Sequence, residues 1–276
     1  MGLTETGYAK INLALHVRKR REDGYHELET LFVFLNDGDR LEAIPSKTLE
    51  LELTGPWAAG LETDDGNLVL RAAHALQRAF GVTHGARLVL DKRLPIAAGL
   101  GGGSADAAAA ARLLNRFWGL GASESQLAEA IGALGADVPA CLASRTVIGR
   151  GIGDVFEETW LDGVLQGAPV LLVNPRVACP TGPVFAGWDG EGSGPLTAHN
   201  ALESRNDLLP SAIALVPEIG DVLRVLGTQD GVRFLNMSGS GATCFALFAD
   251  DAASDDASAR IAATHPDWWR MRGVLR

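Results

Sequence analysis

The chain has 276 residues, of which 47% are hydrophobic and 21% are charged, a balance that is ordinary for a folded globular protein. Lys and Arg number 24 against 34 Asp and Glu, so the formal net charge is -10. Because nucleic acids and membrane surfaces are anionic, this charge argues against a general binder of either. A polyanionic ligand must therefore meet a site that is locally positive or lined by backbone amides.

The cysteines and the start of the chain indicate where the protein works. Cys141, Cys179 and Cys244 are far apart and form no C-x-x-C pair, which predicts neither a disulfide framework nor a thiolate metal site. The first residues lack the basic start and apolar core of a signal peptide, and no apolar run reaches the roughly 18 residues of a membrane-spanning helix. We therefore expect a cytoplasmic protein without a membrane segment.

The first half of the chain predicts strands followed by helices. Residues 9–17 alternate apolar and polar side chains, which is typical of a half-buried strand. Similar patterns predict strands at residues 25–35, 40–44, 49–53 and 86–90. Apolar residues at helical spacing predict helices at residues 67–80, 106–118 and 123–134, the last with Ser123 and Gln126 placed for a capping box.

The second half mixes both kinds of element. Strands are expected at residues 169–173, 233–237 and 244–248, a helix at 210–226 and a Gly/Pro-rich loop at 179–197. A glycine cluster at residues 149–154 is the expected domain boundary. The sequence thus predicts an α+β protein with two domains, residues 1–153 and 154–276.

A glycine-dense loop stands between a predicted strand and a predicted helix. It comprises Pro95, Ile96, Ala97, Ala98, Gly99, Leu100, Gly101, Gly102, Gly103, Ser104 and Ala105. Without side chains at a helix start, unpaired backbone N–H groups and the positive end of the helix dipole can face an anion. The loop is no Walker A motif, because the chain has no Gly-Lys-Ser/Thr. The loop predicts a phosphate site, and a flexible connection is the alternative.

Two charged residues are candidates for chemistry. Asp137 stands where a helix could begin, so it is either an N-cap or a carboxylate placed to accept a proton from an attacking hydroxyl. Lys10, one of only four lysines, lies on the polar side of its predicted strand. It is either solvated or an ammonium that stabilises charge on a transferring phosphoryl group.

Other residues suggest a binding pocket. Tyr25 and His26 follow a turn and either start a strand or present an aromatic face and an imidazole to a nucleobase. Phe185 lies with Thr181 in the predicted loop, where an aromatic residue hints at a ligand contact. Residues 238–243, Ser-Gly-Ser-Gly-Ala-Thr, form either a plain hairpin turn or a second amide-rich nest for phosphates.

Taken together, these segments resemble the GHMP kinases. The motifs that carry the resemblance are Ala-Lys-Ile-Asn-Leu at 9–13, Arg-Glu-Asp-Gly-Tyr-His at 21–26, the glycine loop, Gly-Ala-Asp-Val-Pro at 135–139, Asn-Asp-Leu at 206–208 and Met-Ser-Gly-Ser-Gly-Ala-Thr at 237–243. They follow the family's order over residues 9 to 248. The segment at 21–26 points to the branch of the family whose substrate is a cytidine-diphosphate methylerythritol.

The resemblance implies an N-terminal ATP-loop domain, a smaller C-terminal α+β domain and a substrate cleft between them. It implies that Lys10 and Asp137 are the catalytic pair, that residues 95–105 wrap the phosphates of ATP, and that Mg²⁺ assists, although no sequence feature identifies its ligand. The residues it assigns to the substrate pocket are Asn12, Tyr25, His26, Thr181 and Phe185. The implied reaction phosphorylates the C2 hydroxyl of that substrate on a route to isoprenoid precursors. A monomer or a homodimer is expected.

Two alternatives remain at this point. Another GHMP kinase, acting on a mevalonate-like or homoserine-like alcohol, would share the glycine loop, but Tyr25, His26 and Phe185 suit a pyrimidine better than a small aliphatic substrate. A non-catalytic nucleotide-binding or RNA-binding module would share the α+β layout. The acidic charge argues against RNA, and the presence of both Lys10 and Asp137 argues against an inactive kinase.

Overall fold

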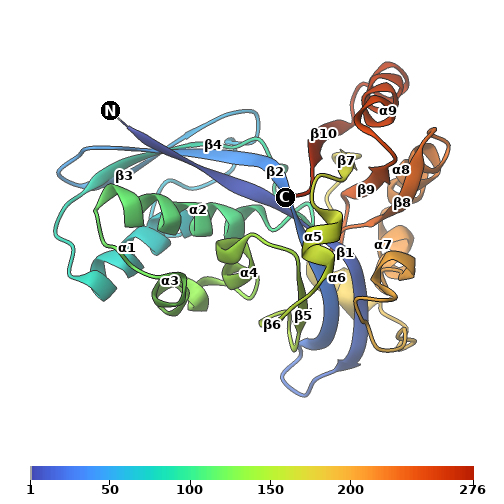
Figure 1. Ribbon diagram of the computed structural model, residues 1–276, viewed down its shortest axis with the longest axis horizontal. Coiled ribbons are helices and arrows are strands. Elements are labelled where there is room, and N and C mark those ends of the chain that lie inside the picture. The colour runs from blue at the N-terminus through green and yellow to red at the C-terminus, as the bar shows by residue number, and fades with distance from the viewer. Residues whose placement is uncertain (1) are drawn as a thin grey trace. The chain divides into compact units, whose positions relative to one another are not determined.

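The computed structural model describes residues 2–276, which fold into two compact units (Figure 1). Neither unit is a continuous stretch of sequence. Unit 1 comprises residues 2–10, Asp37–Ile96 and Gly101–Ser144; unit 2 comprises Ile11–Asn36, Ala97–Leu100 and Arg145–Arg276. The long strands β1 (Leu3–Arg20) and β2 (His26–Ile44) pair with each other and contribute residues to both units. The predicted α+β class is confirmed, whereas the single boundary at 153 and 154 stays a prediction.

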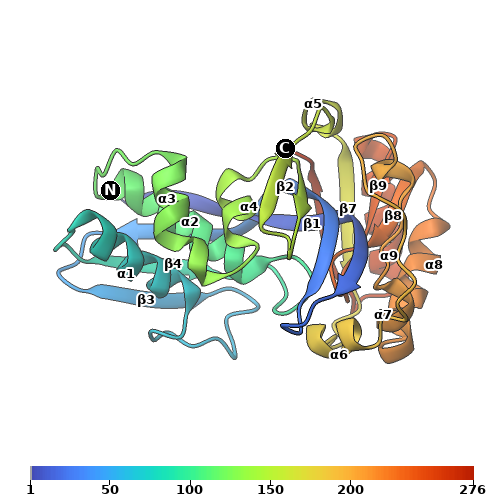
Figure 2. The ribbon, with the colours of Figure 1, turned by 90° about the horizontal axis from the view of Figure 1, so that it is seen from below.

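Unit 1 packs helices on strands. Strand β4 (Ala86–Asp91) pairs in parallel with β3 (Leu49–Thr54) and antiparallel with residues 40–44 of β2. The helices of this unit lie together on one side of the strands (Figures 1 and 2): α1 (Leu68–Phe80), α2 (Gly102–Phe117), α3 (Glu124–Ile131) and α4 (Val138–Ala143). This layering buries the apolar face of each element.

Local sequence explains why the helices of unit 1 form where they do. Asn67 caps α1 by accepting a hydrogen bond from the N–H of Val69, and Gly81 ends that helix with a φ of 66°. Residues 105–111 of α2 are buried, and all of them except Asp106 are alanine. Small side chains let α2 approach α1 and α4 closely, so the helix that leaves the glycine loop is held firmly in the interior of the unit.

Unit 2 is built on an antiparallel sheet with strand order β10-β7-β9-β8. Its strands are β7 (Pro169–Asn174), β8 (Val232–Met237), β9 (Cys244–Phe248) and β10 (Trp269–Val274). Helices α7 (Leu209–Leu215), α8 (Glu218–Gly227) and α9 (Asp251–Thr264) pack against it (Figure 2). The core joins Leu171 and Val173 of β7, Ile219 and Val222 of α8, and Leu15 of β1.

The remaining elements of unit 2 are short. Strand β5 (Val147–Arg150) pairs antiparallel with residues 30–32 of β2 and with β6 (Val155–Glu158), while α5 (Leu161–Leu165) and α6 (Thr181–Ala186) follow. Helix α6 corrects the sequence-based prediction of a continuous loop at 179–197. Thr181 and Phe185 therefore lie in a short helix, which begins directly after Pro180. Pro183 is compatible with the first turn of this helix, where a backbone N–H is not needed.

Three predicted helices were wrong at their bounds. Helix α2 begins at Gly102 instead of residue 106, because its glycine-rich first turn is already helical. The capping box of Ser123 and Gln126 is confirmed, but α3 ends at Ile131 and a short 3₁₀ turn follows at Gly132–Leu134. The helix expected at 210–226 is broken into α7 and α8 at Pro217. Helix α9 and strand β10 were not predicted.

Candidate active site

An ion pair in unit 1 joins two elements that are far apart in sequence. Nζ of Lys10, on β1, lies 2.7 Å from Oδ2 of Asp137, which immediately precedes α4. Lys10 is only 4% exposed, so the alternative of a solvated lysine is wrong. Asp137 occupies the N-cap position but makes no capping hydrogen bond. Its carboxylate, which is 33% exposed, is directed to the ammonium and is accessible to a ligand.

The start of α2 lies against this pair. A Cβ atom added to Gly101 would be 3.0 Å from Cε of Lys10, so a side chain at this position would press on the lysine side chain. Gly101 also has a φ of 62°, and no side chain caps the first N–H groups of α2. Uncapped amides, the positive end of a helix dipole and a buried ammonium are thus brought together, which is an arrangement suited to phosphate.

A second part of the glycine loop belongs to unit 2. A Cβ atom on Gly99 would be 2.3 Å from the carbonyl oxygen of Ser238, and Oγ of Ser238 donates a 2.7 Å hydrogen bond to the carbonyl of Gly99. The N–H of Asn12 in turn donates to Oγ of Ser238 at 3.0 Å. The segment 238–243 is therefore more than a plain hairpin turn, because it holds the middle of the glycine loop in place.

A buried triad of charges in unit 1, which the sequence analysis missed, fixes both ends of the loop. Nζ of Lys92 lies 2.5 Å from Oδ2 of Asp39 and 2.6 Å from Oδ2 of Asp106. Asp39 also accepts hydrogen bonds from the N–H groups of Arg93 and Leu94, just before the loop. Asp106 belongs to the first turns of α2, just after it. The scarcity of lysine in the chain was the only signal that could have drawn attention to Lys92.

Asn12 and Thr181 both make hydrogen bonds to the turn at 238–243. The side-chain amide of Asn12 donates to Oγ1 of Thr30 at 2.8 Å and is buried, while the hydroxyls of Thr181 and Ser240 are 3.0 Å apart. Thr30 was not among the predicted site residues. Within unit 2 the structure thus connects Asn12 and Thr181 through a single turn.

His26 and Phe185 form an aromatic contact in unit 2. Their ring centroids are 5.0 Å apart with an interplanar angle of 38°, and Trp188 packs edge-on to His26 at 5.9 Å. Burial, and next the positive charge of Arg20, lower the pKa of His26, so the imidazole is neutral near pH 7. A neutral imidazole has one donor and one acceptor, as the edge of a pyrimidine does. Sequence analysis missed Trp188, which stood in the segment predicted as loop.

Tyr25 is a predicted pocket residue whose side chain the structure leaves exposed. Its side chain is 62% exposed, and its backbone N–H donates to Oδ1 of Asp23 in the turn between β1 and β2. The prediction that a strand starts at Tyr25 and His26 is confirmed, because His26 is the first residue of β2. The exposed ring of Tyr25 is available to a planar ligand.

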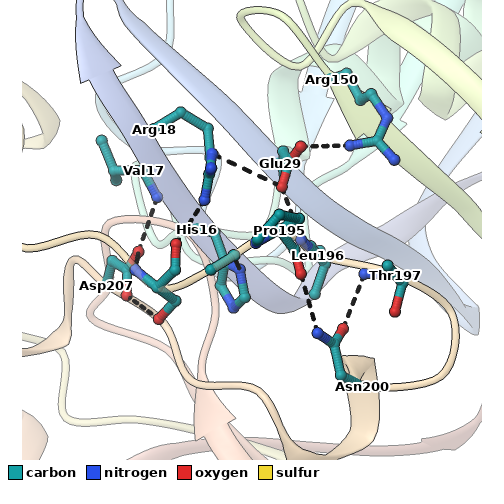
Figure 3. Close-up of polar contacts among 12 residues, drawn as sticks. His16, Val17, Arg18, Glu29, Arg150, Pro195, Leu196, Thr197, Asn200 and Asp207 are labelled. Atoms are coloured by element: carbon teal, nitrogen blue, oxygen red, sulfur yellow. Dashed lines mark hydrogen bonds and ion pairs between the residues drawn. The ribbon is translucent and has the colours of Figure 1, made fainter.

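Residues 193–200, which we call the strap, are tied to the hairpin of β1 and β2 that carries Tyr25 and His26 (Figure 3). Oε2 of Glu29 accepts the N–H of Leu196 at 2.7 Å, and Nδ1 of His16 donates to the carbonyl of Gly194 at 2.7 Å. Asp207 accepts hydrogen bonds from the N–H of Val17 on the hairpin and of Ser193 on the strap.

The two residues of the Asn206-Asp207 motif hold different segments: Asn206 binds the turn at 238–243, and Asp207 joins the strap to the hairpin. Asn206 donates to the carbonyls of Met237 and Gly239 at 2.8 and 2.7 Å, next to the turn that holds the loop. Burial alone would raise the pKa of Asp207, but hydrogen bonds from Ser193, Arg205 and Val17 outweigh burial and hold this pKa below its usual value.

The structure does not support a cysteine nucleophile. Burial, and next the charge of Asp137, raise the pKa of Cys141 to about 12, so its thiol on α4 is no nucleophile at neutral pH. Among residues 2–276, no three His, Cys, Asp or Glu side chains gather in a way that could hold a metal ion. Within the same residues, no helix is both long and apolar enough to cross a membrane.

Comparisons with known proteins agree on one family. Residues 67–145 match the family described as GHMP kinases N terminal domain, and residues 193–267 match GHMP kinases C terminal. A 4-diphosphocytidyl-2-C-methyl-D-erythritol kinase of Rhizorhabdus wittichii is 52% identical, over 99% of this chain and 94% of that protein. The kinase of the same name from Sphingopyxis alaskensis is 49% identical over 99% of both chains.

Solved structures agree with this result. A crystal structure of 4-(cytidine 5'-diphospho)-2C-methyl-D-erythritol kinase superposes with a TM-score of 0.83 at 33% identity and 99% coverage of both chains. The mevalonate kinase of Methanococcus jannaschii has a TM-score of 0.72 at 11% identity, covering 100% of this chain and 98% of that one. At such low identity the second likeness concerns the fold alone.

Proposed function

The chain belongs to the 4-diphosphocytidyl-2-C-methyl-D-erythritol kinase family of GHMP kinases, and on this premise we propose the reaction that it catalyses. It transfers the γ-phosphate of ATP to the C2 hydroxyl of 4-diphosphocytidyl-2-C-methyl-D-erythritol, a step toward isoprenoid precursors. The observation that carries the mechanism is the 2.7 Å contact between Lys10 and Asp137 beside the first residues of α2.

In the proposed mechanism Asp137 accepts the proton of the C2 hydroxyl as its oxygen attacks the γ-phosphorus. The bond between that phosphorus and the bridging oxygen of ADP breaks, so no phosphoenzyme forms. Lys10 stabilises the negative charge that spreads over the attacking oxygen and the transferring group. Because Lys10 is already paired with Asp137, both groups are oriented before the substrate arrives.

The glycine loop supplies the donor side in this proposal. The backbone amides of residues 95–105, above all those at the start of α2, bind the phosphates of ATP. Mg²⁺, when bound, would neutralise charge on the β- and γ-phosphates. It usually keeps several waters and takes only one or two protein carboxylates, so it needs no ready-made cluster of three acidic groups.

The pocket in the proposal is made by Asn12, Tyr25, His26, Thr181 and Phe185. His26, with its neutral imidazole, and Phe185, with its ring 5.0 Å away, support recognition of cytosine. Mevalonate and homoserine offer no planar group to these rings, so they are the informative rival acceptors.

The test is ADP release by the purified protein with ATP and Mg²⁺. We expect turnover with 4-diphosphocytidyl-2-C-methyl-D-erythritol and none above background with mevalonate, homoserine or no acceptor. In the same assay Asp137→Asn should lower kcat by about 10²- to 10⁴-fold, the usual contribution of general acid–base catalysis, and leave ATP binding in place. Turnover with mevalonate alone would refute the cytidine pocket, and full activity of Asp137→Asn would refute the base.

A further inference from the structure

The guanidinium of Arg112 connects three elements of unit 1. Arg112 lies on α2, about two turns after the glycine loop. Its Nη1 donates to the carbonyls of Cys141 and Leu142 at 2.8 and 3.2 Å, and its Nη2 donates to the carbonyl of Thr6 at 2.8 Å. One side chain thus joins α2, the last turn of α4 and strand β1.

Each of these elements carries one part of the proposed machinery. Helix α2 begins with the glycine loop, α4 begins directly after Asp137, and β1 carries Lys10 four residues after Thr6. The distance between Lys10 and Asp137 therefore depends on how α4 is placed against β1. In addition to the ion pair of Lys10 and Asp137, Arg112 connects α4 to β1 by hydrogen bonds. Asp137 lies at the start of α4, whereas Arg112 binds its end.

The chemistry of the contact suits an arginine. Helix α4 has only six residues, so its last carbonyls have no partner within the helix, and a cation at this end also opposes the helix dipole. The planar fork of a guanidinium can donate in two directions at once, toward α4 and toward β1. A lysine ammonium has the charge but not the fork.

We propose that Arg112 is a positioning residue for catalysis, which holds α4 and β1 so that Asp137 stays within hydrogen-bonding distance of Lys10. The inference rests on the roles proposed above for Lys10 and Asp137. It predicts that loss of Arg112 affects the chemical step more than the binding of either substrate, because its guanidinium donates to the end of α4 and to β1, the elements that place Asp137 and Lys10.

A matched control lies one turn further along the same helix. Arg116 donates to Oε2 of Glu5 at 2.6 Å and to the carbonyl of Thr4 at 2.9 Å. It therefore joins α2 to β1 as Arg112 does, but it makes no contact with α4 among the hydrogen bonds of the described residues. If a connection between α2 and β1 were all that mattered, replacing Arg112 and replacing Arg116 should lower kcat equally.

The experiment compares Arg112→Met, Arg112→Lys and Arg116→Met at a temperature where melting curves show each protein folded. A misplacement near 1 Å can cost about 10²-fold in rate, so we expect Arg112→Met to lower kcat by about 10- to 100-fold while both KM values change less than about threefold. Arg116→Met should keep kcat within about threefold. Should Arg112→Met not fold, Arg112→Lys, which retains the charge, should still lose kcat several-fold.

A double variant separates this inference from the proposed function. If Arg112 acts through Asp137, adding Arg112→Met to Asp137→Asn should lower kcat little beyond Asp137→Asn alone. Losses that multiply, or an Arg112→Met enzyme indistinguishable from Arg116→Met, would overturn the inference while the base assignment stands. Full turnover of Asp137→Asn would overturn both.

Discussion

Nζ of Lys92 lies 2.6 Å from Oδ2 of Asp106, beneath the first turns of the helix that leaves the glycine loop. Burial raises the pKa of Asp106 to about 8, and the Asp39 carboxylate adds to this effect against the opposing charge of Lys92. Near pH 7 the raised pKa of Asp106 therefore favours the protonated form of this carboxyl group, which lowers the negative charge that is buried beside Lys92.

The protonation of Asp106 makes the stability of the protein depend on pH. Its pKa is raised in the folded state, so the folded protein binds this proton more tightly than the unfolded chain, whose value is about 3.9. The stabilisation is complete below about pH 4 and is lost as the pH rises toward about 8, at no more than about 1.4 kcal/mol per pH unit. Asp106→Asn, which resembles the protonated group, should flatten this fall in denaturant titrations between pH 5 and 8.5.

Asp39→Asn is the matched comparison, because it removes the carboxylate on the other side of Lys92. It leaves Asp106 as the one remaining carboxyl group of the triad, so Asp106 must ionise in its buried site to balance the Lys92 ammonium, a cost that Asp106→Asn does not carry. We therefore expect Asp39→Asn to be far less stable than Asp106→Asn at pH 6. Equal stabilities of the two variants would contradict the assignment of the raised pKa to Asp106.

Local patterns explain which parts of the fold the sequence predicted. The alternation at residues 9–17, the capping box of Ser123 and the glycine run at 99–103 are short-range signals, and each element is found close to its expected place. The start of the helix predicted at 106 and the continuity of the helix predicted at 210–226 were wrong for local reasons too, since the first turn of α2 includes glycines and Pro217 separates α7 from α8.

The candidate site is predictable only in part, because its contacts join distant segments. Lys10 and Asp137 are 127 residues apart, and their ion pair follows from packing of α4 against β1 rather than from either local sequence. Lys92 resembles a surface lysine in sequence and is nevertheless buried between two carboxylates. Trp188 and Arg112 gave no local signal at all, since their partners are brought to them by the tertiary fold.

A substitution at Gly101 tests whether catalysis depends on the close contact between the glycine loop and Lys10. Gly101→Ala places a Cβ atom 3.0 Å from Cε of Lys10 in addition to the roughly 1–2 kcal/mol of strain at its φ of 62°. Gly121→Ala carries the same strain, with a φ of 64°, but its Cβ atom meets nothing within 4 Å. We expect similar losses of stability, and a fall in kcat of at least tenfold for Gly101→Ala only. Equal kcat values would contradict the proposed contact between the loop and the catalytic lysine.

Phe185 tests whether the aromatic contact recognises the cytosine. Stacking of a base on an aromatic side chain is worth about 1–3 kcal/mol, so Phe185→Leu should raise KM for the cytidine substrate by about 5- to 100-fold and leave KM for ATP unchanged. Trp160→Leu is the control, because Trp160 also packs against a histidine of unit 2, His199, at 5.8 Å, and is 55% exposed. An equal KM in the two variants would remove Phe185 from the proposed pocket.

Asp207 should make the protein acid-sensitive through its contacts with the strap. Its pKa is lowered in the folded state, so the stabilisation is present above the unfolded value of about 3.9 and is lost as the pH falls through the lowered folded value. Asp207→Asn should therefore be less stable than the parent at pH 7, by about 1–3 kcal/mol, the worth of hydrogen bonds to a charged group. Denaturant titrations at several pH values measure this difference, which should shrink as the pH falls below about 4.

The control for Asp207 is Asp189→Asn. Asp189 is an exposed carboxylate that accepts one hydrogen bond, from the N–H of Glu191, just before the strap. Its replacement should leave stability within about 0.5 kcal/mol of the parent at every pH, as is usual for surface substitutions. Because Asp207 holds the strap to the hairpin of Tyr25 and His26, Asp207→Asn should also raise KM for the cytidine substrate. A stability difference that stays constant from pH 7 to pH 3 would show that the contribution of Asp207 does not depend on its charge.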